Sequence, residues 1–263
     1  MTQPRHEGAD AAGASPATPA SVSVPHAPRN LSAVTGEEYL APLTLVWVRH
    51  GVTTMTREHR LSGSSVPGPS LSARGRVQAA KAADVMYRIG RDTWRGMAPV
   101  SRIVASPMVR TQETAAALGR RLGLPVETDA AVREVDFGTW EGLTAEEAVE
   151  RDGDALLRWQ DGDGAAPGGE SIADVGARTV SWAESAAHWH ADTGGAARTV
   201  AVVSHAVAIK AAVGTLMGMD AAHAARMWPV PASYTMVQLR VTPTGQLAQT
   251  HLVCVGAPSD EEE

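Results

Sequence analysis

The feature that most constrains the fold is a short apolar run, Leu43–Val48, which is rich in aliphatic and β-branched residues. A run of this kind without polar alternation is typical of a strand that is covered on both faces, as in the middle of a parallel sheet. Val200–Val203, continuing to Ser204, has the same character, and Ser101–Ala105 is a shorter strand candidate. We therefore expect a sheet whose middle strands are buried from both sides.

Helical spacing fills the segments between these strands. Apolar residues recur at i, i+3, i+4 and i+7 in two places, which predicts one helix near 82–89 and another near 209–217. Two further helices are expected to begin at capping boxes, in which Thr144 or Ser171 is followed by a carboxylate at the spacing of this motif. The second of these helices should run to about His190.

A hairpin is expected after Pro231. Thr235–Val241 and Gln246–Val253 resemble strands and flank the turn sequence Pro243-Thr244-Gly245. Such a hairpin belongs at the edge of the sheet. The predicted fold class is therefore α/β, with an open, mostly parallel sheet flanked by helices on both faces.

Composition divides the chain into one domain and two short ends. The length of 263 residues suits a single α/β domain with a substantial core. Residues 1–40 are rich in Ala, Ser, Pro and Gly, which predicts a disordered N-terminal extension, and 257–263 are expected to form a solvated acidic tail. The expected domain spans residues 41–256.

Charge and cysteine content exclude several function classes. A net charge of −6 gives no field that attracts nucleic acid or an anionic membrane, so neither is an expected partner. The single cysteine, Cys254, cannot form an intramolecular disulfide or supply the thiolates of a structural zinc site. No segment between Met1 and Glu38 has the apolar stretch of a secretory signal, so we expect a cytoplasmic protein.

Polar residues with chemical potential follow the predicted strands. The first strand ends in Arg49-His50-Gly51, the short one in Ser106-Pro107, and the third in Ser204-His205-Ala206. In open α/β sheets, ligands bind beyond the carboxyl ends of the strands, where helices present unpaired backbone N–H groups. Two histidines and an arginine are thus expected at one rim.

These residue types match the requirements of phosphoryl transfer, which needs a nucleophile, cations around the phosphate oxygens and a proton for the leaving oxygen. A neutral imidazole, here His50, is a good nucleophile toward phosphorus. Arg49, and Arg110 in the expected loop after the second strand, could make bidentate contacts with phosphate. Their charges should keep His50 neutral, and His205 would add another donor.

Arg49-His50-Gly51 after an apolar strand resembles the hallmark of the histidine phosphatase superfamily, which includes the cofactor-dependent phosphoglycerate mutases. Further segments resemble the family in the same order along the chain. These segments are Leu71–Ala79, Ser106–Ala115, Arg133–Gly142, Gly168–Ser171 and Val203–His205. The resemblance covers the chain from about Leu43 to Val253 and implies a phosphoglycerate mutase-like fold.

Residue by residue, the resemblance implies His50 as the phosphorylated nucleophile and Arg49, Arg110 and His205 as the phosphate pocket. Glu134 matches the proton donor of the family, a role that a carboxyl group of raised pKa can fill before it activates water. Asp136 and Glu141 lie nearby in the sequence, but the position before Phe137-Gly138 favours Glu134. Neither a metal ion nor another cofactor is implied.

Three positions depart from the family pattern. Val52 stands where Glu or Gln is frequent, Thr56 where Asn is frequent, and Ala206 where Gly is usual. Thr53 matches a Ser/Thr position, and both Thr53 and Thr56 are candidate phosphate ligands. We expect an altered phosphate loop with activity that is weakened or retuned.

The function predicted from these patterns is hydrolysis of a small phosphomonoester through a phosphohistidine intermediate. A cofactor-dependent phosphoglycerate mutase is the first alternative, disfavoured because Glu134 is followed by Val135-Asp136-Phe137-Gly138 and because no basic segment lies between Gly142 and Gly169. A noncatalytic phospholigand-binding protein of the same fold is the second. The patterns determine neither the physiological substrate nor the oligomeric state.

Other polar and aromatic residues receive structural interpretations. His188 and His190 are expected to be solvated, while Trp140, Trp159 and Trp182 are expected in the core or rim, with Trp159 near the mouth of the pocket. Substrate specificity is expected to come from Thr144–Gly169 and from the loop Arg57–Pro69.

Overall fold

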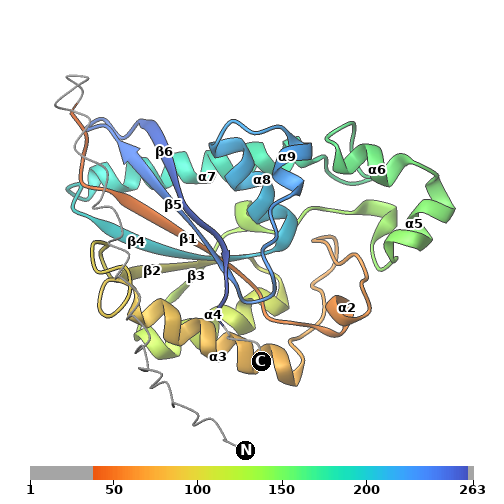
Figure 1. Ribbon diagram of the computed structural model, residues 1–263, viewed down its shortest axis with the longest axis horizontal. Helices are drawn as coiled ribbons and strands as arrows, with labels where there is room; N and C mark the ends of the chain where they lie inside the picture. Colours follow the sequence, from red (N-terminus) through yellow and green to blue (C-terminus); the bar gives the residue numbers. More distant parts are fainter. Residues whose placement is uncertain (1–37, 260–263) are drawn as a thin grey trace, which may run out of the picture.

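The computed structural model describes residues 38–259, which form a six-stranded sheet with helices on both faces (Figure 1). Residues 1–37 of the predicted extension and 260–263 of the predicted acidic tail lie outside the described residues. The strands are β1 (Leu43–Arg49), β2 (Val100–Ala105), β3 (Val126–Thr128), β4 (Arg198–Ser204), β5 (Tyr234–Val241) and β6 (Leu247–Ala257).

The strand order is β3-β2-β4-β1-β5-β6, so β1 and β4 lie in the middle of the sheet. β1, β2, β3 and β4 pair in parallel, while β5 pairs antiparallel with β1 and with β6. The predicted mostly parallel sheet and its C-terminal hairpin at one edge are confirmed.

Helices connect the strands and cover both faces. The helices are α2 (Thr54–Arg57), α3 (Ala73–Arg88), α4 (Val109–Leu122), α5 (Ala145–Asp152), α6 (Ala155–Gln160), α7 (Ile172–Asp192), α8 (Ala206–Leu216) and α9 (Ala221–Ala225), with short 3-10 helices η1 (Ala130–Val132) and η2 (Gly138–Trp140). α5 and α7 begin at the capping boxes of Thr144 and Ser171, as predicted.

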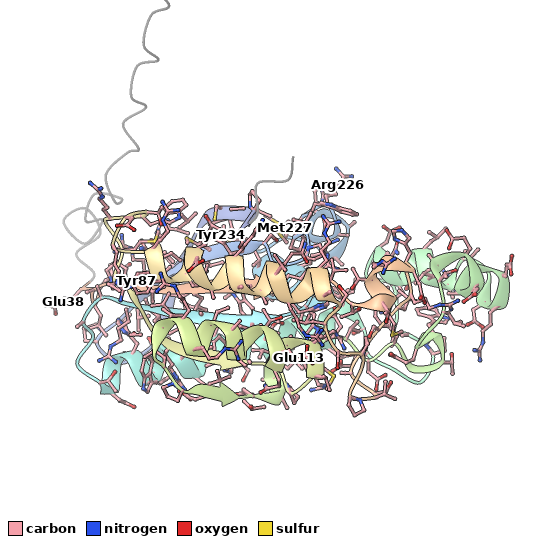
Figure 2. The ribbon with its side chains drawn as sticks, turned by 90° about the horizontal axis from the view of Figure 1, so that it is seen from below. Glu38, Tyr87, Glu113, Arg226, Met227 and Tyr234 are labelled. Atoms are coloured by element: carbon pink, nitrogen blue, oxygen red, sulfur yellow. The ribbon has the colours of Figure 1, made fainter. Side chains whose placement is uncertain are left out.

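Alternate residues of β1 point to opposite faces of the sheet, and each set enters a separate core. Val46 and Val48 pack with residues of α3 and α4, which lie side by side across one face (Figure 2). Leu45 and Trp47 pack against α7 and α8 on the other face, where Trp47 meets Trp182 edge to face at 5.7 Å between ring centroids. Burial on both faces explains why β1 is apolar along its length.

A third cluster supports the segment that follows η1. Phe137, Trp140 and Trp159 stack at tilted or edge-to-face angles and pack with residues of α5, α6, α7 and α8. The predicted core role of the three tryptophans, including Trp182, is confirmed because all are buried. α5 and α6 extend past the end of the sheet on this cluster (Figure 1).

Two elements differ from the expectations. Arg110 lies in the first turn of α4 and not in a loop, because α4 begins after Met108 without a side-chain cap and so lacks the usual start signal. The edge strand β3 has only three residues and is partly exposed, so it shows no apolar pattern.

The prediction that His190 is solvated is wrong. His190 is fully buried, with Nε2 2.8 Å from the carbonyl oxygen of Ala41.

Candidate active site

A cavity of about 410 Å³ opens at the carboxyl ends of β1 and β4. Its lining comes from segments that are far apart in the sequence and includes most of the predicted site residues. The lining residues are Arg49, His50, Thr53, Thr56, His59, Arg60, Leu61, Ser62, Arg110, Glu134, Phe137, Ala206, Val207, Trp228, Val230 and Pro231. His205 stands against His50, with 5.2 Å between the ring centroids. We call this space the His50 cavity.

His50 follows β1 directly, and only 6% of its surface is exposed. Its Nδ1 atom lies 2.7 Å from the carbonyl oxygen of Gly51. A carbonyl oxygen can only accept a hydrogen bond, so Nδ1 carries the proton and Nε2 keeps its lone pair. Burial, and then the charges of Arg110 and Arg49, hold the pKa of His50 well below its usual value. The neutral ring thus offers Nε2 as a nucleophile even in mildly acidic solution.

Glycines lock two of the sequence motifs together beside this histidine. A Cβ atom on Gly51 would lie 2.4 Å from the carbonyl oxygen of Gly75, and one on Gly75 would lie 2.1 Å from the carbonyl oxygen of Val52. No methyl group fits at either distance. The loop after β1 and the first turn of α3 can therefore approach this closely only because residues 51 and 75 are both glycine. This contact fixes the backbone whose carbonyl sets the His50 tautomer.

The guanidinium groups of Arg110 and Arg49 are anchored at one side and unpaired at the other. Nη2 of Arg110 donates to the carbonyl oxygens of Ser62 and Gly63 at 2.9 and 3.1 Å, while Nε and Nη1 are buried without a partner. Nη1 of Arg49 donates to the carbonyl oxygen of Pro229 at 2.9 Å, and its Nε is also buried and unpaired. Buried donors without partners are costly, so these atoms fit an anion with several oxygens.

His205 is fully buried and is oriented by Ser106. Nε2 of His205 lies 2.7 Å from the Ser106 hydroxyl oxygen, which accepts the backbone N–H of Met108 at 3.4 Å. The hydroxyl is free to donate to Nε2, and in that arrangement the proton of the ring lies on Nδ1, which is buried without a partner. Burial, and then Arg110 and His50, hold the pKa of His205 well below its usual value. Ser106 was predicted to lie at the end of a strand, but the sequence assigned it no role.

Glu134 is buried against the N-terminus of α8, with 5% of its surface exposed. Its Oε1 accepts from the backbone N–H groups of Val135 at 3.0 Å and Ala208 at 2.9 Å, and its Oε2 accepts from that of Val207 at 3.3 Å. These bonds fix the carboxyl group at the wall of the His50 cavity. The neighbouring carboxylates of Asp136 and Glu141 do not line the cavity.

Those two carboxylates organise the surrounding loops instead. Asp136 accepts from the N–H of Gly138 at 2.8 Å, and Glu141 accepts from that of Gly63, also at 2.8 Å. Burial raises the pKa of Glu141. The carbonyl oxygen of Gly63 in turn accepts from Arg110, so Glu141 supports the loop that holds this arginine.

The segment that carries Glu134 is fixed by an arginine that the sequence reasoning did not single out. Arg178 on α7 donates to the carbonyl oxygens of Arg133 and Glu134 at 2.8 and 3.0 Å. It also contacts both carboxylate oxygens of Glu170, at 3.0 and 3.1 Å. The Gly168–Ser171 motif therefore has a structural basis, since Glu170 bridges α7 and the Glu134 segment.

Thr53 and Thr56, the two candidate phosphate ligands, form the capping box of α2. The Thr53 hydroxyl accepts from the N–H of Thr56 at 3.1 Å, the Thr56 hydroxyl accepts from that of Thr53 at 3.3 Å, and the two hydroxyl oxygens lie 3.0 Å apart. Both residues line the His50 cavity, as does Ala206. Val52 does not line it, since its N–H and carbonyl group bind Gln78 and Ser72.

The outer wall differs from the expectation. The loop Arg57–Pro69 contributes as predicted, but Thr144–Gly169 contributes no residue to the His50 cavity, and Trp159 does not lie at its mouth. Trp159 is buried, and its indole Nε1 donates to the carbonyl oxygen of Glu170 at 3.0 Å. Trp228, which is 76% exposed, and the segment that follows it line the cavity instead.

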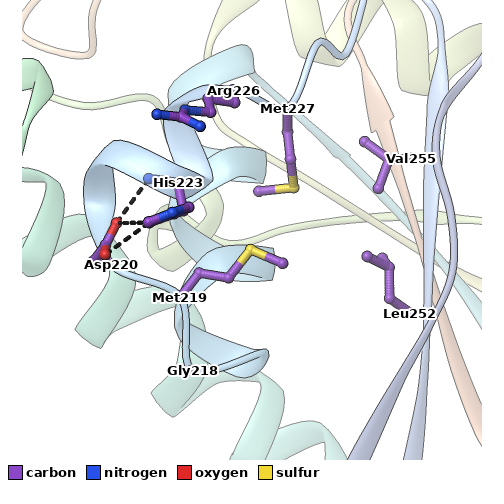
Figure 3. Close-up of a pocket in the computed structure, with 8 residues that line it drawn as sticks. All are labelled: Gly218, Met219, Asp220, His223, Arg226, Met227, Leu252 and Val255. Carbon is purple, nitrogen blue, oxygen red and sulfur yellow. Dashed lines mark hydrogen bonds and ion pairs between the residues drawn. The ribbon is translucent and has the colours of Figure 1, made fainter.

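Another hollow, of about 610 Å³, lies between the start of α9 and β6 (Figure 3). Its wall includes Met219, Met227, Leu252 and Val255, and its one histidine, His223, is bound to the carboxylate of Asp220 at 2.7 Å. Asp220 caps α9 through the His223 N–H, so this pair is structural. None of the predicted site residues lines this hollow.

Residues 38–259 contain neither a cluster of metal-binding side chains nor a helix that could cross a membrane. No group of three or more His, Cys, Asp or Glu side chains is arranged to hold a metal ion. No helix in this part of the chain combines the length and apolar character needed to cross a membrane.

Comparisons with known proteins show which family the sequence resembles. The sequence model of the histidine phosphatase superfamily (branch 1) matches residues 45–247. The bifunctional protein Rv2228c of Mycobacterium tuberculosis is 38% identical over 170 residues, 64% of this chain and 43% of that protein. Glucosyl-3-phosphoglycerate phosphatase of Mycolicibacterium vanbaalenii is 35% identical over 189 residues, 71% of this chain and 77% of the relative.

The solved structures give the same answer. The native structure of mycobacterial glucosyl-3-phosphoglycerate phosphatase Rv2419c superimposes with a TM-score of 0.71 at 30% identity, covering 82% of this chain and 99% of that one. The matched part is less than half of the bifunctional relative, at 43% of its length. The sequence match spans most of the described domain, and the chain therefore belongs to the histidine phosphatase superfamily.

Proposed function

We propose that this protein is a phosphatase that hydrolyses a small phosphomonoester through a phosphohistidine intermediate on His50. One observation carries the proposal: among residues 38–259, Nε of Arg49, Nε and Nη1 of Arg110 and Nδ1 of His205 are all buried and unpaired around one histidine. A phosphoryl group has enough oxygens to accept from all of them. Such fixed donors stabilise the charge of the transferring group without reorganisation.

The first step transfers the phosphoryl group to the protein. Nε2 of His50 attacks phosphorus while the bond between phosphorus and the leaving oxygen breaks. Glu134, entering the step protonated, gives its proton to that oxygen, and the alcohol departs. Arg49, Arg110 and His205 hold the phosphate oxygens throughout.

The second step returns the protein to its starting state. The carboxylate of Glu134 takes a proton from a water molecule as the water oxygen attacks phosphorus. The bond between phosphorus and Nε2 breaks, Nε2 keeps the electron pair, and inorganic phosphate leaves. Because arginine and histidine side chains supply the donors to the phosphate oxygens, we expect turnover to persist in the presence of a metal chelator.

The proposal is tested by comparing wild-type protein with His50→Asn on an aryl phosphate and on small alkyl phosphate esters. We expect phosphate release by the wild type, loss of at least about 10³-fold in the variant, and an acid-labile phosphoryl group trapped on His50. His188→Asn is the matched control, because His188 is exposed and lies outside the cavity.

Two outcomes would overturn it. Equal activity of the wild type and His50→Asn would point to a phospholigand-binding protein. Interconversion of 2- and 3-phosphoglycerate without release of phosphate would identify a mutase. The ester named in the relatives, glucosyl-3-phosphoglycerate, is the first physiological candidate to include.

We also place the reaction in the cytoplasm. The chain has one cysteine, Cys254, which suits a reducing compartment. Fractionation of the native host, with detection of the protein by antibody, checks this placement.

A further inference from the structure

A second hollow of about 270 Å³ adjoins the His50 cavity. The two spaces share two wall residues, Val207 and Trp228. The walls of the second hollow are otherwise mostly small or apolar, but they include one cation, Lys210. We call this space the Lys210 pocket.

Lys210 is half-buried and has hydrogen-bonding capacity to spare. Its Nζ donates to the carbonyl oxygen of Ala225 at 2.8 Å, and the ion pairs recorded among residues 38–259 do not include it. An ammonium group has three N–H donors, so two remain for a ligand. Burial, and then the charge of Arg49, lower the pKa of Lys210, while the charge of Glu134 opposes that shift. A bound anion would offset the cost of holding this charge away from water.

The other cation on the outer wall is already neutralised. Nη1 of Arg60 lies 3.0 Å from the carboxylate of Glu147 and donates to the carbonyl oxygen of Gly142 at 2.7 Å, and Nε lies 3.4 Å from Glu58. Arg60 thus already pairs with two carboxylates, whereas the ion pairs recorded among residues 38–259 do not include Lys210. Lys210 is therefore the cation that is better placed to bind a second anionic group of a ligand, outside the part of the His50 cavity that Arg49 and Arg110 line.

Lys210 belongs to the N-terminal part of α8, and the carboxyl group of Glu134 binds the backbone of the same part of this helix. Val207, whose N–H donates to Glu134, and Lys210 are three positions apart on α8, so their side chains lie on neighbouring parts of one face. Both line the Lys210 pocket. An alcohol that leaves beside Glu134 therefore has its remaining atoms next to Val207, on the way to Lys210.

Trp228 closes the outer side of this path. Its ring lies 5.6 Å from Nζ of Lys210, within the range of a cation–π contact, although 76% of Trp228 is exposed. The carbonyl oxygen of the next residue, Pro229, accepts a hydrogen bond from Arg49, so the Trp228 segment is held against the His50 cavity. A large exposed indole fixed between two hollows is an unusual surface feature and suits a ligand that passes along it.

We propose that the Lys210 pocket binds the alcohol portion of the ester and that Lys210 contacts a carboxylate on that portion, so the preferred substrates are phosphate monoesters of hydroxy acids. The inference rests on the proposed phosphatase function and adds a specificity-determining residue to it. It also restores a role to Thr144–Gly169, because Trp159 and Gln160 line the Lys210 pocket.

The test compares two esters that differ in one carboxylate, 3-phosphoglycerate and glycerol 3-phosphate. Phosphate release gives the ratio of kcat/KM for the acid to kcat/KM for its neutral counterpart in wild type, Lys210→Met and Lys210→Arg. A hydrogen bond to a charged group corresponds to about 10- to 100-fold. We expect the ratio to fall by at least about tenfold in Lys210→Met, chiefly through KM for the acid, and to recover in Lys210→Arg.

The chain offers a matched control, since its only other lysine is Lys81 on the exposed side of α3. Lys81→Met should leave the ratio unchanged. A ratio in Lys210→Met that stays within about twofold of wild type overturns the inference, because a merely structural role would weaken both esters alike.

Binding without turnover separates this inference from the proposed function. Calorimetry with His50→Ala and His50→Ala/Lys210→Met gives the ratio of Kd values for the same two esters. A ratio that falls by at least about tenfold with the lysine supports the subsite even if no ester is hydrolysed, and an unchanged ratio overturns it. Absence of phosphate release by the wild type would count against the phosphatase alone.

Discussion

The imidazole rings of His50 and His205 meet edge to face, with 5.2 Å between their centroids and 62° between their planes. The carbonyl oxygen of Gly51 holds His50 in the tautomer with its proton on Nδ1, and the hydroxyl of Ser106 binds Nε2 of His205. In the described part of the chain, no hydrogen bond reaches Nε2 of His50 or Nδ1 of His205. The two rings therefore bring two unpaired nitrogen atoms, one from each ring, to the same site.

Replacing Ser106 should disturb the tautomer of His205. In Ser106→Ala, Nε2 of His205 loses its hydrogen-bond donor, so the ring can place its proton on Nε2 instead of Nδ1. We expect kcat to fall by about 10- to 100-fold with little change in the fold. Nitrogen-15 NMR of the histidine rings checks the tautomer directly.

Ser101→Ala is a suitable control for that variant, because Ser101 lies on β2 and is exposed at the opposite end of the strand. An unchanged His205 spectrum together with full activity in Ser106→Ala would show that the hydroxyl does not position the ring.

Glu134→Gln should separate the two chemical steps. An aryl phosphate has a good leaving group that needs little protonation, whereas an alkyl ester needs the proton of Glu134. We therefore expect a burst of about one aryl alcohol per protein molecule followed by slow turnover, because the amide cannot activate water for the second step. For alkyl esters the expected loss is about 10²- to 10⁴-fold without a burst. Rapid-mixing kinetics measures both.

The corresponding variant of a neighbouring carboxylate, Glu141→Gln, is the control. Its amide oxygen can still accept from the Gly63 N–H, so we expect no burst and only a small loss. A burst in Glu141→Gln and none in Glu134→Gln would reassign the proton donor.

The free energy of unfolding should fall as the pH drops below the ordinary histidine range. Burial and the nearby arginines lower the pKa of His50, and burial, Arg110 and His50 lower that of His205. The unfolded chain therefore binds protons near pH 6.5 that the folded protein does not, so this stabilisation is complete above that pH and is lost below it. Each ring should lower the free energy of unfolding by on the order of 1 kcal/mol between pH 7.5 and 5.5.

Urea unfolding at the two pH values, in buffer without phosphate, measures this loss. His50→Gln should reduce the pH dependence by about the share of one histidine, and His50→Gln/His205→Gln by about twice as much. A pH dependence that is the same in all three proteins would contradict the assignment of the lowered pKa values to these rings.

Much of the fold was readable because its determinants are local. The apolar run Leu43–Val48 predicted a strand buried on both faces, and the hydroxyls of Thr144 and Ser171 marked the starts of α5 and α7. Where a local signal was missing, the prediction was wrong: α4 begins without a cap, so Arg110 was expected in a loop. The prediction that His190 is solvated was wrong for a different reason, because the carbonyl oxygen of Ala41 that binds it lies far away in the sequence.

The sequence by itself determined the family and predicted the candidate residues of the site. Arg49, His50, Arg110, Glu134 and His205 stand at strand ends or in ordered motifs, and parallel strands bring their carboxyl ends to one edge by geometry alone. Which atoms of these residues are unpaired was not readable from the motifs.

Only the tertiary structure decided how those residues are held and what surrounds them. Arg49 is anchored by Pro229, 180 residues further along the chain, and Glu134 is fixed by the N–H groups of α8. Trp228 lines the His50 cavity together with Arg49, which lies far away in the sequence. Contacts between backbone groups that are far apart in the sequence decide the tautomers, the unpaired donors and the walls of the cavities. No periodicity or motif in a single sequence predicts such contacts.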